Sequence, residues 1–292
     1  MVSVEANAKI NLTLDILGVR PDGFHEVEMV MQSVKLFDLV HLEKQPEGIS
    51  LRLDSAELPA DETNLAWKAA RFFLDEYNIQ DGVSISVEKR IPIAAGLAGG
   101  STDAAGVLIG MNRLFKTGLS AKVLCKLGER IGSDVPFCVE GGTMLAKGRG
   151  EILQRLPDVP SLSVVLAKPP VSVSTAWAYK TYDRIGVSSH PDTKAMLTAL
   201  FEGSVEKVAR GLVNVLEVVT MREYPAISAY KRVLMENGAI ASLMSGSGPT
   251  VFGLAATQAD AELAAQALLR EDPEAEVFVV PTAGRNNLSG QK

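Results

Sequence analysis

The stretch PIAAGLAGGSTDAAG, residues 92–106, joins a glycine-rich loop directly to a segment with helical periodicity. Apolar residues recur at helical spacing over residues 104–115, so we expect the loop to open a helix. Loops of this kind offer backbone N–H groups and the positive end of a helix dipole to an anion. Gly96, Gly99 and Gly100 permit positive φ angles and a close approach to a ligand. The stretch therefore predicts a main-chain cradle for phosphate groups.

The glycine spacing differs from that of the two commonest phosphate-binding loops. A Walker A loop carries Lys directly after its second glycine, whereas Ser101 follows Gly100 here. A dinucleotide-binding loop needs G-x-G-x-x-G, and these glycines fall as G-x-x-G-G. Glycines alone leave open a turn that only packs its helix closely. Ser101 or Thr102 can cap this helix, and Asp103 in its first turn suits the dipole.

The first strand is predicted from a strict alternation of residue types. From Val2 to Ile16 every even position is apolar and every odd position is polar, which is typical of a half-buried strand. Lys9 and Asn11 therefore emerge from the same face. A lysine on the polar face of a strand is usually a solvated surface charge, and a group available for chemistry is the alternative.

Two further segments place polar groups among apolar residues. Asp134 lies in GSDVPF, residues 132–137, where a charge must be paired, hydrogen-bonded or functional, and taken alone a helix cap is the favoured explanation. The sequence SGSGP, residues 245–249, lies between two apolar runs. It predicts either a tight hairpin turn or a flexible loop that closes on a ligand.

Length and composition exclude several classes of protein. The 292 residues are 47% apolar, enough to bury a large core, and are long enough for two domains. The net charge of −6 and the dispersed basic residues argue against a nucleic-acid partner. Cys125 and Cys138 lack a C-x-x-C or His partner, so we expect two reduced thiols. We find neither a basic leader with an apolar core nor a long apolar run, and therefore expect a cytoplasmic protein without a membrane segment.

The order of the expected elements predicts a mixed α+β fold. Strands are grouped in the first half of the chain instead of alternating strictly with helices. Helical patterns are expected at residues 64–77, 121–131, 193–235 and 259–270, and strands at 83–87, 143–146, 162–167, 241–254 (two strands) and 276–280. We place a domain boundary between Pro157 and Pro160. This gives an N-terminal domain of residues 1–157, a C-terminal domain of 158–282 and a flexible tail of 283–292.

Five segments together carry a resemblance to a known family. Residues 92–106 resemble the second motif of the GHMP kinases, the group named for galactokinase, homoserine kinase, mevalonate kinase and phosphomevalonate kinase. The other matching segments are AKINLTLDILGVRPDGFHEVEMVMQSV (8–34), GSDVPFCVEGGTMLAKGRGE (132–151), KPPVSVSTAWAYK (168–180) and MSGSGPTVFGL (244–254). They narrow the resemblance to members whose acceptor is a cytidine diphosphate-linked methylerythritol. Five motifs in the right order are highly specific.

This resemblance implies a fold and a reaction. The fold would be a two-domain GHMP kinase fold, with an N-terminal domain similar to ribosomal protein S5 domain 2, a ferredoxin-like C-terminal domain and a cleft between them. The reaction would be ATP-dependent phosphorylation of the acceptor's 2-hydroxyl in non-mevalonate isoprenoid precursor synthesis, with Mg²⁺ accompanying ATP. The partner would be this small molecule, with no nucleic acid and no membrane, and the chain would be a monomer or a homodimer.

The resemblance also assigns roles to individual residues. It implies that Asp134 accepts the proton of the substrate hydroxyl, while Lys9 orients the carboxylate and stabilises developing negative charge. Asn64 and Lys89 are matched to the adenosine end of the nucleotide. Without the resemblance, Asn64 would be interpreted as the start of a helix and Lys89 as an exposed charge at the end of a strand. The implied ATP-binding residues are Asn64, Lys89, Pro92, Ile93, Ala94, Ala95, Gly96, Leu97, Ala98, Gly99, Gly100, Ser101 and Thr102.

Acceptor binding is assigned to aromatic residues and to the second glycine loop. The implied substrate-binding residues are Asn11, Phe24, His25, Tyr179, Ser245, Gly246, Ser247 and Gly248. We expect a cytosine ring to stack between Phe24 and Tyr179 while His25 presents hydrogen-bonding groups to its edge. The family usually has Tyr where this chain has Phe24, which keeps the ring but removes a hydroxyl. Ser101 and Thr102 are the nearest candidate Mg²⁺ ligands, and because either can equally cap the helix, the metal ligands stay open.

Two other functions compete with this interpretation. One is phosphorylation of another small molecule by the same family, against which Phe24, His25 and Tyr179 favour an acceptor that carries a base. The other is a nucleotide-binding regulator without catalysis, against which the presence of both Lys9 and Asp134 counts.

Overall fold

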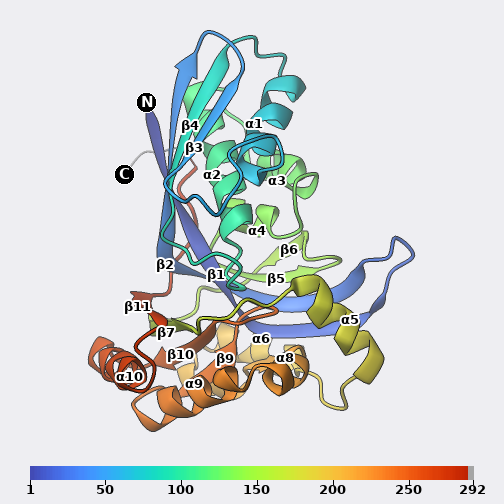
Figure 1. Cartoon of the computed structure of the whole chain (residues 1–292). Helices are drawn as coiled ribbons and strands as arrows, with labels where there is room; N and C mark the ends of the chain where they lie inside the picture. The colour runs from blue at the N-terminus through green and yellow to red at the C-terminus, as the bar shows by residue number, and fades with distance from the viewer. Residues whose placement is uncertain (289–292) are drawn as a thin grey trace.

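Two β-sheets organise the chain, and the computed structural model describes residues 1–288 (Figure 1). The larger, seven-stranded sheet has the order β3-β4-β2-β1-β8, with β5 paired to β2 and β6 paired to β5. Its strands are β1 (Val2–Val19), β2 (His25–Gln45), β3 (Ile49–Leu53), β4 (Gly82–Glu88), β5 (Thr143–Lys147), β6 (Ile152–Arg155) and β8 (Val213–Asn214). The smaller, antiparallel sheet has the order β11-β7-β10-β9. Its strands are β7 (Ser163–Lys168), β9 (Ala241–Met244), β10 (Val251–Ala255) and β11 (Glu276–Pro281).

The helices divide between the two sheets, which confirms the mixed α+β class. The helices that accompany the larger sheet are α1 (Leu65–Glu76), α2 (Gly99–Leu114), α3 (Ala121–Glu129) and α4 (Val135–Glu140). The remaining helices are α5 (Thr175–Ile185), α6 (Thr193–Phe201), α7 (Val205–Arg210), α8 (Glu217–Glu223), α9 (Pro225–Glu236) and α10 (Gln258–Glu271). Helices α9 and α10 pack on the smaller sheet, and α5 lies beside the projecting β1–β2 hairpin (Figure 1). Within residues 1–288 no helix is long and apolar enough to cross a membrane.

Strand β1 confirms the predicted alternation but not the expected solvent exposure of its polar face. On its apolar face Ala8, Ile10 and Leu12 are buried in a cluster that includes Phe252 of the smaller sheet. On its polar face Ser3 and Glu5 are exposed, but the polar side chains in the second half of the alternation are buried. The buried polar residues are Lys9, Asn11, Thr13 and Asp15. The second half of this strand therefore carries polar groups into the interior, where Lys9 contacts the glycine-rich loop at Gly96.

The long helical pattern expected over residues 193–235 is broken into four helices. Gly203, with φ of +64°, separates α6 from α7, and Pro225 starts α9. Between α7 and α8 the chain forms β8, whose two residues pair in parallel with Thr13 and Leu14 of β1. The expected helices near residues 64–77, 121–131 and 259–270 are confirmed, with shifts of one or two residues at their ends.

The expectation of a flexible tail over residues 283–292 is wrong for residues 283–288. Ala283 is buried, and its carbonyl accepts a hydrogen bond from the Gln32 side chain. Asn286 donates to the carbonyls of Cys138 and Val139, and Arg285 forms an ion pair with Glu140. Low apolar content suggested a loose end, but these polar side chains satisfy the carbonyl groups at the end of α4. Residues 289–292 lie outside the described residues.

The connection between the two sheets runs from the end of β6 at Arg155 to the start of β7 at Ser163. The expected boundary near residues 157–160 lies within this connection. The division into residues 1–157 and 158–282 stays a prediction.

Candidate active site

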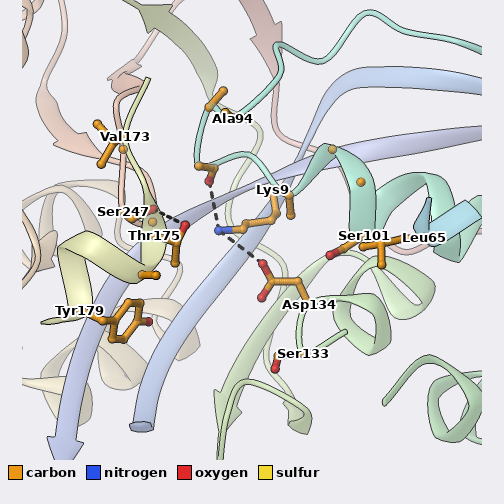
Figure 2. Close-up of a pocket in the computed structure, with 18 of the residues that line it drawn as sticks. Lys9, Leu65, Ala94, Ser101, Ser133, Asp134, Val173, Thr175, Tyr179 and Ser247 are labelled. Carbon is orange, nitrogen blue, oxygen red and sulfur yellow. Dashed lines mark hydrogen bonds and ion pairs between the residues drawn. The ribbon is translucent and has the colours of Figure 1, made fainter. Parts of the chain in front are cut away.

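A cavity of about 1060 Å³ collects side chains from both halves of the chain (Figure 2). Its walls come from β1, the β1–β2 turn, the start of α1, the 92–100 loop, the start of α4, α5 and the 245–248 loop. Of the residues assigned from the sequence, Leu97, Thr102 and Ser245 do not line it. The others do, so segments far apart in the sequence meet around one volume.

Lys9 and Asp134 face each other across this cavity (Figure 2). Lys9 Nζ lies 4.0 Å from Asp134 Oδ2, 2.7 Å from Asn11 Oδ1 and 3.1 Å from the carbonyl oxygen of Gly96. The Lys9 side chain is 6% exposed and that of Asp134 is 31% exposed. Lys9 is therefore not a solvated surface charge. Its ammonium group is fixed by two neutral acceptors and still faces an accessible carboxylate.

The cap explanation for Asp134 does not hold. Asp134 occupies the position before α4, but its side chain makes no capping hydrogen bond. The carboxylate instead points into the cavity towards Lys9 (Figure 2). Nearby Cys138 is buried, and burial together with the charge of Asp134 raises its thiol pKa to about 12. The thiol is thus neutral at ordinary pH.

The 92–100 loop leads into α2 with positive φ angles at Ala94 (52°), Gly96 (74°) and Ala98 (63°). Gly99 and Gly100 do not have positive φ, so the sequence expectation holds only for Gly96. The left-handed Ala98 precedes α2, and no side chain caps the helix. The capping role expected for Ser101 or Thr102 is therefore wrong. The first N–H groups of α2 are left available to an anion in the cavity, as the cradle requires.

Ser101 and Thr102 point in different directions. Ser101 lines the cavity (Figure 2). Thr102 is turned inward, where its hydroxyl lies 3.3 Å from the Asn7 carbonyl oxygen and 3.4 Å from Cys138 Sγ. Leu97 is also buried, in the apolar cluster between the two sheets. Of the two candidate metal ligands only Ser101 reaches the space where a ligand would lie.

The 245–248 loop packs directly on the 92–100 loop. A Cβ added to Gly96 would lie far inside van der Waals contact with the carbonyl oxygen of Ser245. The Ser245 hydroxyl donates to the Gly96 carbonyl at 3.0 Å, so it braces the loop and is buried. Gly246, Ser247 and Gly248 line the cavity, and the Ser247 hydroxyl lies 2.9 Å from that of Thr175. The segment is a hairpin turn between β9 and β10 and also a wall of the cavity.

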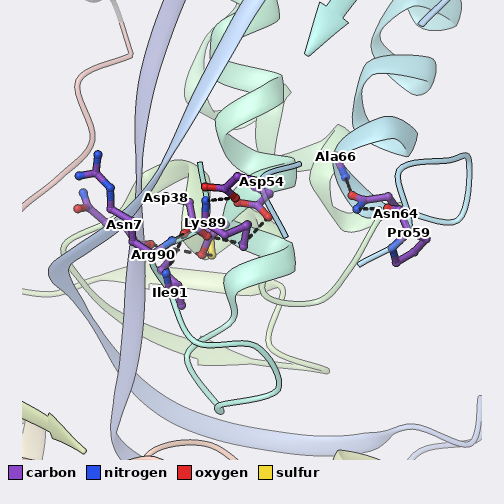
Figure 3. A network of polar contacts seen from close by, with 12 residues as sticks. Asn7, Asp38, Asp54, Pro59, Asn64, Ala66, Lys89, Arg90 and Ile91 are labelled. Carbon is purple, nitrogen blue, oxygen red and sulfur yellow. Dashed lines mark hydrogen bonds and ion pairs between the residues drawn. The ribbon is translucent and has the colours of Figure 1, made fainter. Parts of the chain in front are cut away.

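Lys89 sits in a buried ion triad at the edge of the cavity (Figure 3). Its Nζ lies 2.5 Å from Asp38 Oδ2 and 2.6 Å from Asp103 Oδ2. Asp103 therefore pairs with a cation and is not a dipole partner in the first turn of α2, contrary to the sequence expectation. Burial raises the pKa of Asp103 to about 8, against the opposing effect of Lys89. Burial lowers the pKa of Lys89, but Asp103 and Asp38 raise it by more.

This triad fixes the entry to the 92–100 loop. Asp38 Oδ1 accepts from the N–H groups of Arg90 and Ile91 at 2.6 and 2.8 Å. The Lys89 ammonium expected to reach the nucleotide is thus held between two carboxylates. Asn64 also has structural partners, since it caps α1 through the N–H of Ala66 and donates to the carbonyl of Pro59 (Figure 3). Both side chains line the cavity while performing these tasks.

The opposite end of the cavity carries the three aromatic residues to which the family resemblance assigns acceptor binding. Tyr179 of α5 packs against His25, with ring centroids 4.7 Å apart and planes at 42°. His25 Nε2 lies 2.8 Å from Asp183 Oδ1. Phe24 is 51% exposed and lies under the Arg149 guanidinium at 5.0 Å. Tyr179 and His25 form one wall, Phe24 lines the same cavity, and the stacking of a cytosine ring between Phe24 and Tyr179 stays a prediction.

Sequence reasoning missed several residues of this cavity. Arg149, Thr175 and Lys180 line it, as does Asp183, which orients His25. The first three lie inside segments that carry the family resemblance, and this position is the signal that could have identified them. The spacing of residues within these segments does not indicate them. Asp183 lies beyond these segments, and its position beside His25 follows only from the docking of α5 against the β1–β2 hairpin.

The donor set does not form a dedicated metal cage. Within residues 1–288 no three His, Cys, Asp or Glu side chains are grouped to hold a metal ion. Mg²⁺ bound with a nucleotide usually keeps several waters and takes one or two protein oxygens in addition to the phosphates. The Ser101 hydroxyl fits that sparse arrangement.

Comparison with known proteins identifies both halves of the chain. Residues 64–142 match the model of the GHMP kinases N terminal domain, and residues 196–274 match that of the GHMP kinases C terminal domain. A 4-diphosphocytidyl-2-C-methyl-D-erythritol kinase from Acetivibrio thermocellus is 46% identical over 281 residues, covering 96% of this chain and 99% of the relative. One from Geobacillus kaustophilus is 49% identical over 255 residues, covering 87% of this chain and 88% of the relative.

Solved structures agree with these matches. A crystal structure of 4-(cytidine 5'-diphospho)-2C-methyl-D-erythritol kinase superposes with a TM-score of 0.82 at 31% identity, covering 97% of this chain and all of the other. A homoserine kinase from Cytophaga hutchinsonii superposes with a TM-score of 0.77 at 20% identity, covering 97% of this chain and 95% of the other, and shows the shared fold alone.

Proposed function

Because this chain belongs to the GHMP kinase family, we propose that it transfers the γ-phosphoryl group of ATP to the 2-hydroxyl of 4-diphosphocytidyl-2-C-methyl-D-erythritol. This is a step of non-mevalonate isoprenoid precursor synthesis. The observation that carries the proposal is the facing pair of Lys9 and Asp134, which lies between an uncapped helix N-terminus and an aromatic wall. The names of the relatives at 46% and 49% identity supply the substrate.

The donor would lie along the 92–100 loop. In our proposal the first N–H groups of α2 bind the nucleotide phosphates, since the helix offers them without a competing side-chain cap. Mg²⁺ would supply the positive charge that a single lysine cannot, with Ser101 as the nearest hydroxyl ligand. Asn64 and Lys89 would border the adenosine, with their side chains held by protein partners.

The acceptor would approach from the aromatic wall. The ring pair of Tyr179 and His25 offers a surface on which cytosine can stack, and stacking is worth about 1–3 kcal/mol per base. Arg149, which lies over Phe24, offers a positive charge to the acceptor's diphosphate. The methylerythritol end would then reach towards Asp134 and Lys9.

Proton removal is assigned to Asp134. An oxygen atom placed about 2.8 Å from both Lys9 Nζ and Asp134 Oδ2 fits the 4.0 Å gap between them. A hydroxyl in that position donates its proton to the carboxylate as its oxygen attacks the γ-phosphoryl group. Lys9, held by Asn11 and Gly96, stabilises the negative charge that develops on the attacking oxygen.

A steady-state assay of ADP release tests the proposal. The purified chain is supplied with ATP, Mg²⁺ and one acceptor at a time: 4-diphosphocytidyl-2-C-methyl-D-erythritol, mevalonate or homoserine. We expect ADP release to depend on the cytidine-bearing acceptor. Release with mevalonate or homoserine but not with the cytidine compound would refute the acceptor assignment, and no acceptor-dependent release would refute the kinase itself.

A further inference from the structure

The short strand β8 and the start of α8 hold the backbone of the 245–248 loop from outside the cavity. Asn214 Nδ2 donates to the carbonyls of Met244 and Gly246, both at 2.8 Å, while its Oδ1 accepts from the N–H of Leu216 at 3.0 Å. Only one orientation of the amide satisfies all three partners. Asn214 is 3% exposed, so each of these contacts is shielded from water.

Glu217 and Thr220 act on the same turn and on the residue that precedes it. Glu217 Oε1 accepts from the N–H of Met244 at 2.7 Å and is paired with Lys231. Thr220 donates to the carbonyl of Ser247 at 3.4 Å. The segment 214–220 thus contacts successive backbone groups of the turn that joins β9 to β10.

The loop in turn contacts the group that fixes Lys9. The carbonyl oxygen of Gly96 accepts both from the Ser245 hydroxyl, at 3.0 Å, and from Lys9 Nζ, at 3.1 Å. Gly246 stands beside the same ammonium, since an added Cβ there would lie 3.4 Å from Lys9 Nζ. A shift of the 245–248 backbone therefore acts on two groups beside the Lys9 ammonium, Gly246 and the Gly96 carbonyl.

Asn214 is itself anchored to the strand that carries Lys9. It pairs with Leu14 of β1, and the next residue, Val215, donates its N–H to the Leu14 carbonyl at 3.1 Å. The backbone of Asn214 is fixed in the larger sheet, and its side chain holds the loop of the smaller sheet. The amide bridges the two parts of the molecule at the height of the cavity.

We propose that Asn214 is a positioning residue for phosphoryl transfer: through its hydrogen bonds to Met244, at the end of β9, and to Gly246, in the 245–248 loop, it sets the place of Lys9 relative to Asp134. This rests on the proposed function, because it concerns the same reaction. Asn214 does not line the cavity and acts only through the loop. The transfer step, rather than acceptor binding at Tyr179 and His25, is the property that it controls.

The Asn214→Asp variant tests this role. It keeps the shape and the acceptor for Leu216, but it replaces the donor of two hydrogen bonds with an oxygen that repels both carbonyls. The matched control is Asn112→Asp. Asn112 is also a buried asparagine that donates to a backbone carbonyl, that of Leu119, and it lies away from the cavity.

We expect Asn214→Asp to lower kcat by about 10- to 100-fold, as displacements of about 1 Å can do, while the KM for the cytidine acceptor stays within about threefold. Asn112→Asp should lower thermal stability and leave kcat within about twofold. Backbone hydrogen exchange should speed up over residues 244–250 in Asn214→Asp and remain unchanged over α5.

Each outcome separates the two proposals. If Asn214→Asp retains wild-type kcat, the positioning role is wrong and the kinase assignment stands. The same conclusion follows if kcat and acceptor affinity fall together and the fall matches the fraction of unfolded protein in the sample. If the wild-type chain releases no ADP with the acceptor, the proposed function fails. In that case hydrogen exchange still tests whether Asn214 holds the loop in place. Faster backbone exchange over residues 244–250 in Asn214→Asp supports this contact, and an unchanged exchange rate rejects it.

Discussion

Lys9 Nζ lies 4.0 Å from Asp134 Oδ2, close enough for the two charges to interact and far enough apart for a hydroxyl oxygen to contact both. Lys9 comes from the first strand and Asp134 from the residue before α4. Lys9 makes its shorter contacts to Asn11 and to the Gly96 carbonyl, and the Asp134 carboxylate remains partly exposed to the cavity. This relationship makes separate predictions for the two side chains and for the loops around them.

Asp134→Asn should abolish most of the activity without unfolding the chain. The amide keeps the size of the side chain but cannot accept a proton, and a general base contributes about 10²–10⁴-fold to a rate. We expect kcat for acceptor-dependent ADP release to fall by that factor, with a thermal midpoint near that of the wild type. Asp272→Asn, at the end of α10, serves as the control for the same chemical change. Full turnover in Asp134→Asn would contradict the assignment.

Gly96→Ala should disrupt the packing of two loops. The residue has a φ of +74°, and its Cβ would overlap the Ser245 carbonyl oxygen. Gly118→Ala is a matched control, since Gly118 has a φ of +66° and open space around it. The control should cost about 1 kcal/mol, the strain of the backbone alone, and Gly96→Ala clearly more. Denaturant unfolding measures both, and equal losses would mean that the close approach contributes nothing.

Tyr179→Ala should weaken acceptor binding selectively. Removal of the ring that packs on His25 takes away a stacking surface worth about 1–3 kcal/mol, or roughly 5- to 150-fold in the KM for the acceptor. The KM for ATP should stay unchanged, and Tyr179→Phe should retain acceptor binding because it keeps the ring. An equal rise in both KM values would indicate a general distortion of the cavity instead.

Asp103→Asn should flatten the dependence of stability on pH. Burial raises the Asp103 pKa from 3.8 to about 8, so between these values the folded chain retains a proton that the unfolded chain has released. The free energy of unfolding therefore falls as the pH rises through this window, by at most about 1.4 kcal/mol per pH unit. Urea unfolding at pH 5, 6, 7 and 8 should show a smaller fall in the variant. Identical slopes in both proteins would place the titration elsewhere.

Removal of residues 283–292 should destabilise the chain. The deletion leaves the carbonyls of Cys138 and Val139 without the Asn286 amide and removes the partner of Glu140. Loss of several such hydrogen bonds, at about 1 kcal/mol each, should lower the thermal midpoint by several degrees. A chain ending at Thr282 with an unchanged midpoint would show that the contacts of residues 283–288 carry no stability.

Local features of the sequence predicted much of the architecture. Strict alternation over residues 2–16 fixed β1 and placed Lys9 and Asn11 on one face, which the 2.7 Å hydrogen bond between them confirms. The glycine spacing and the apolar periodicity that follows it predicted the loop and α2. The order of five motifs predicted the family. Each of these depends on φ/ψ preferences or on residues within one or two turns of each other.

The tertiary structure alone decided what each polar group contacts. Lys89 meets Asp38 and Asp103 because β4 pairs with β2 and α2 packs on that sheet. Asn214 reaches the Gly246 carbonyl because β8 joins β1. Such contacts depend on strand register and on the docking of two sheets, which join residues too far apart for a local pattern to specify. The sequence determined which elements form and which chemistry they carry, whereas long-range packing determined which charges remain free to act.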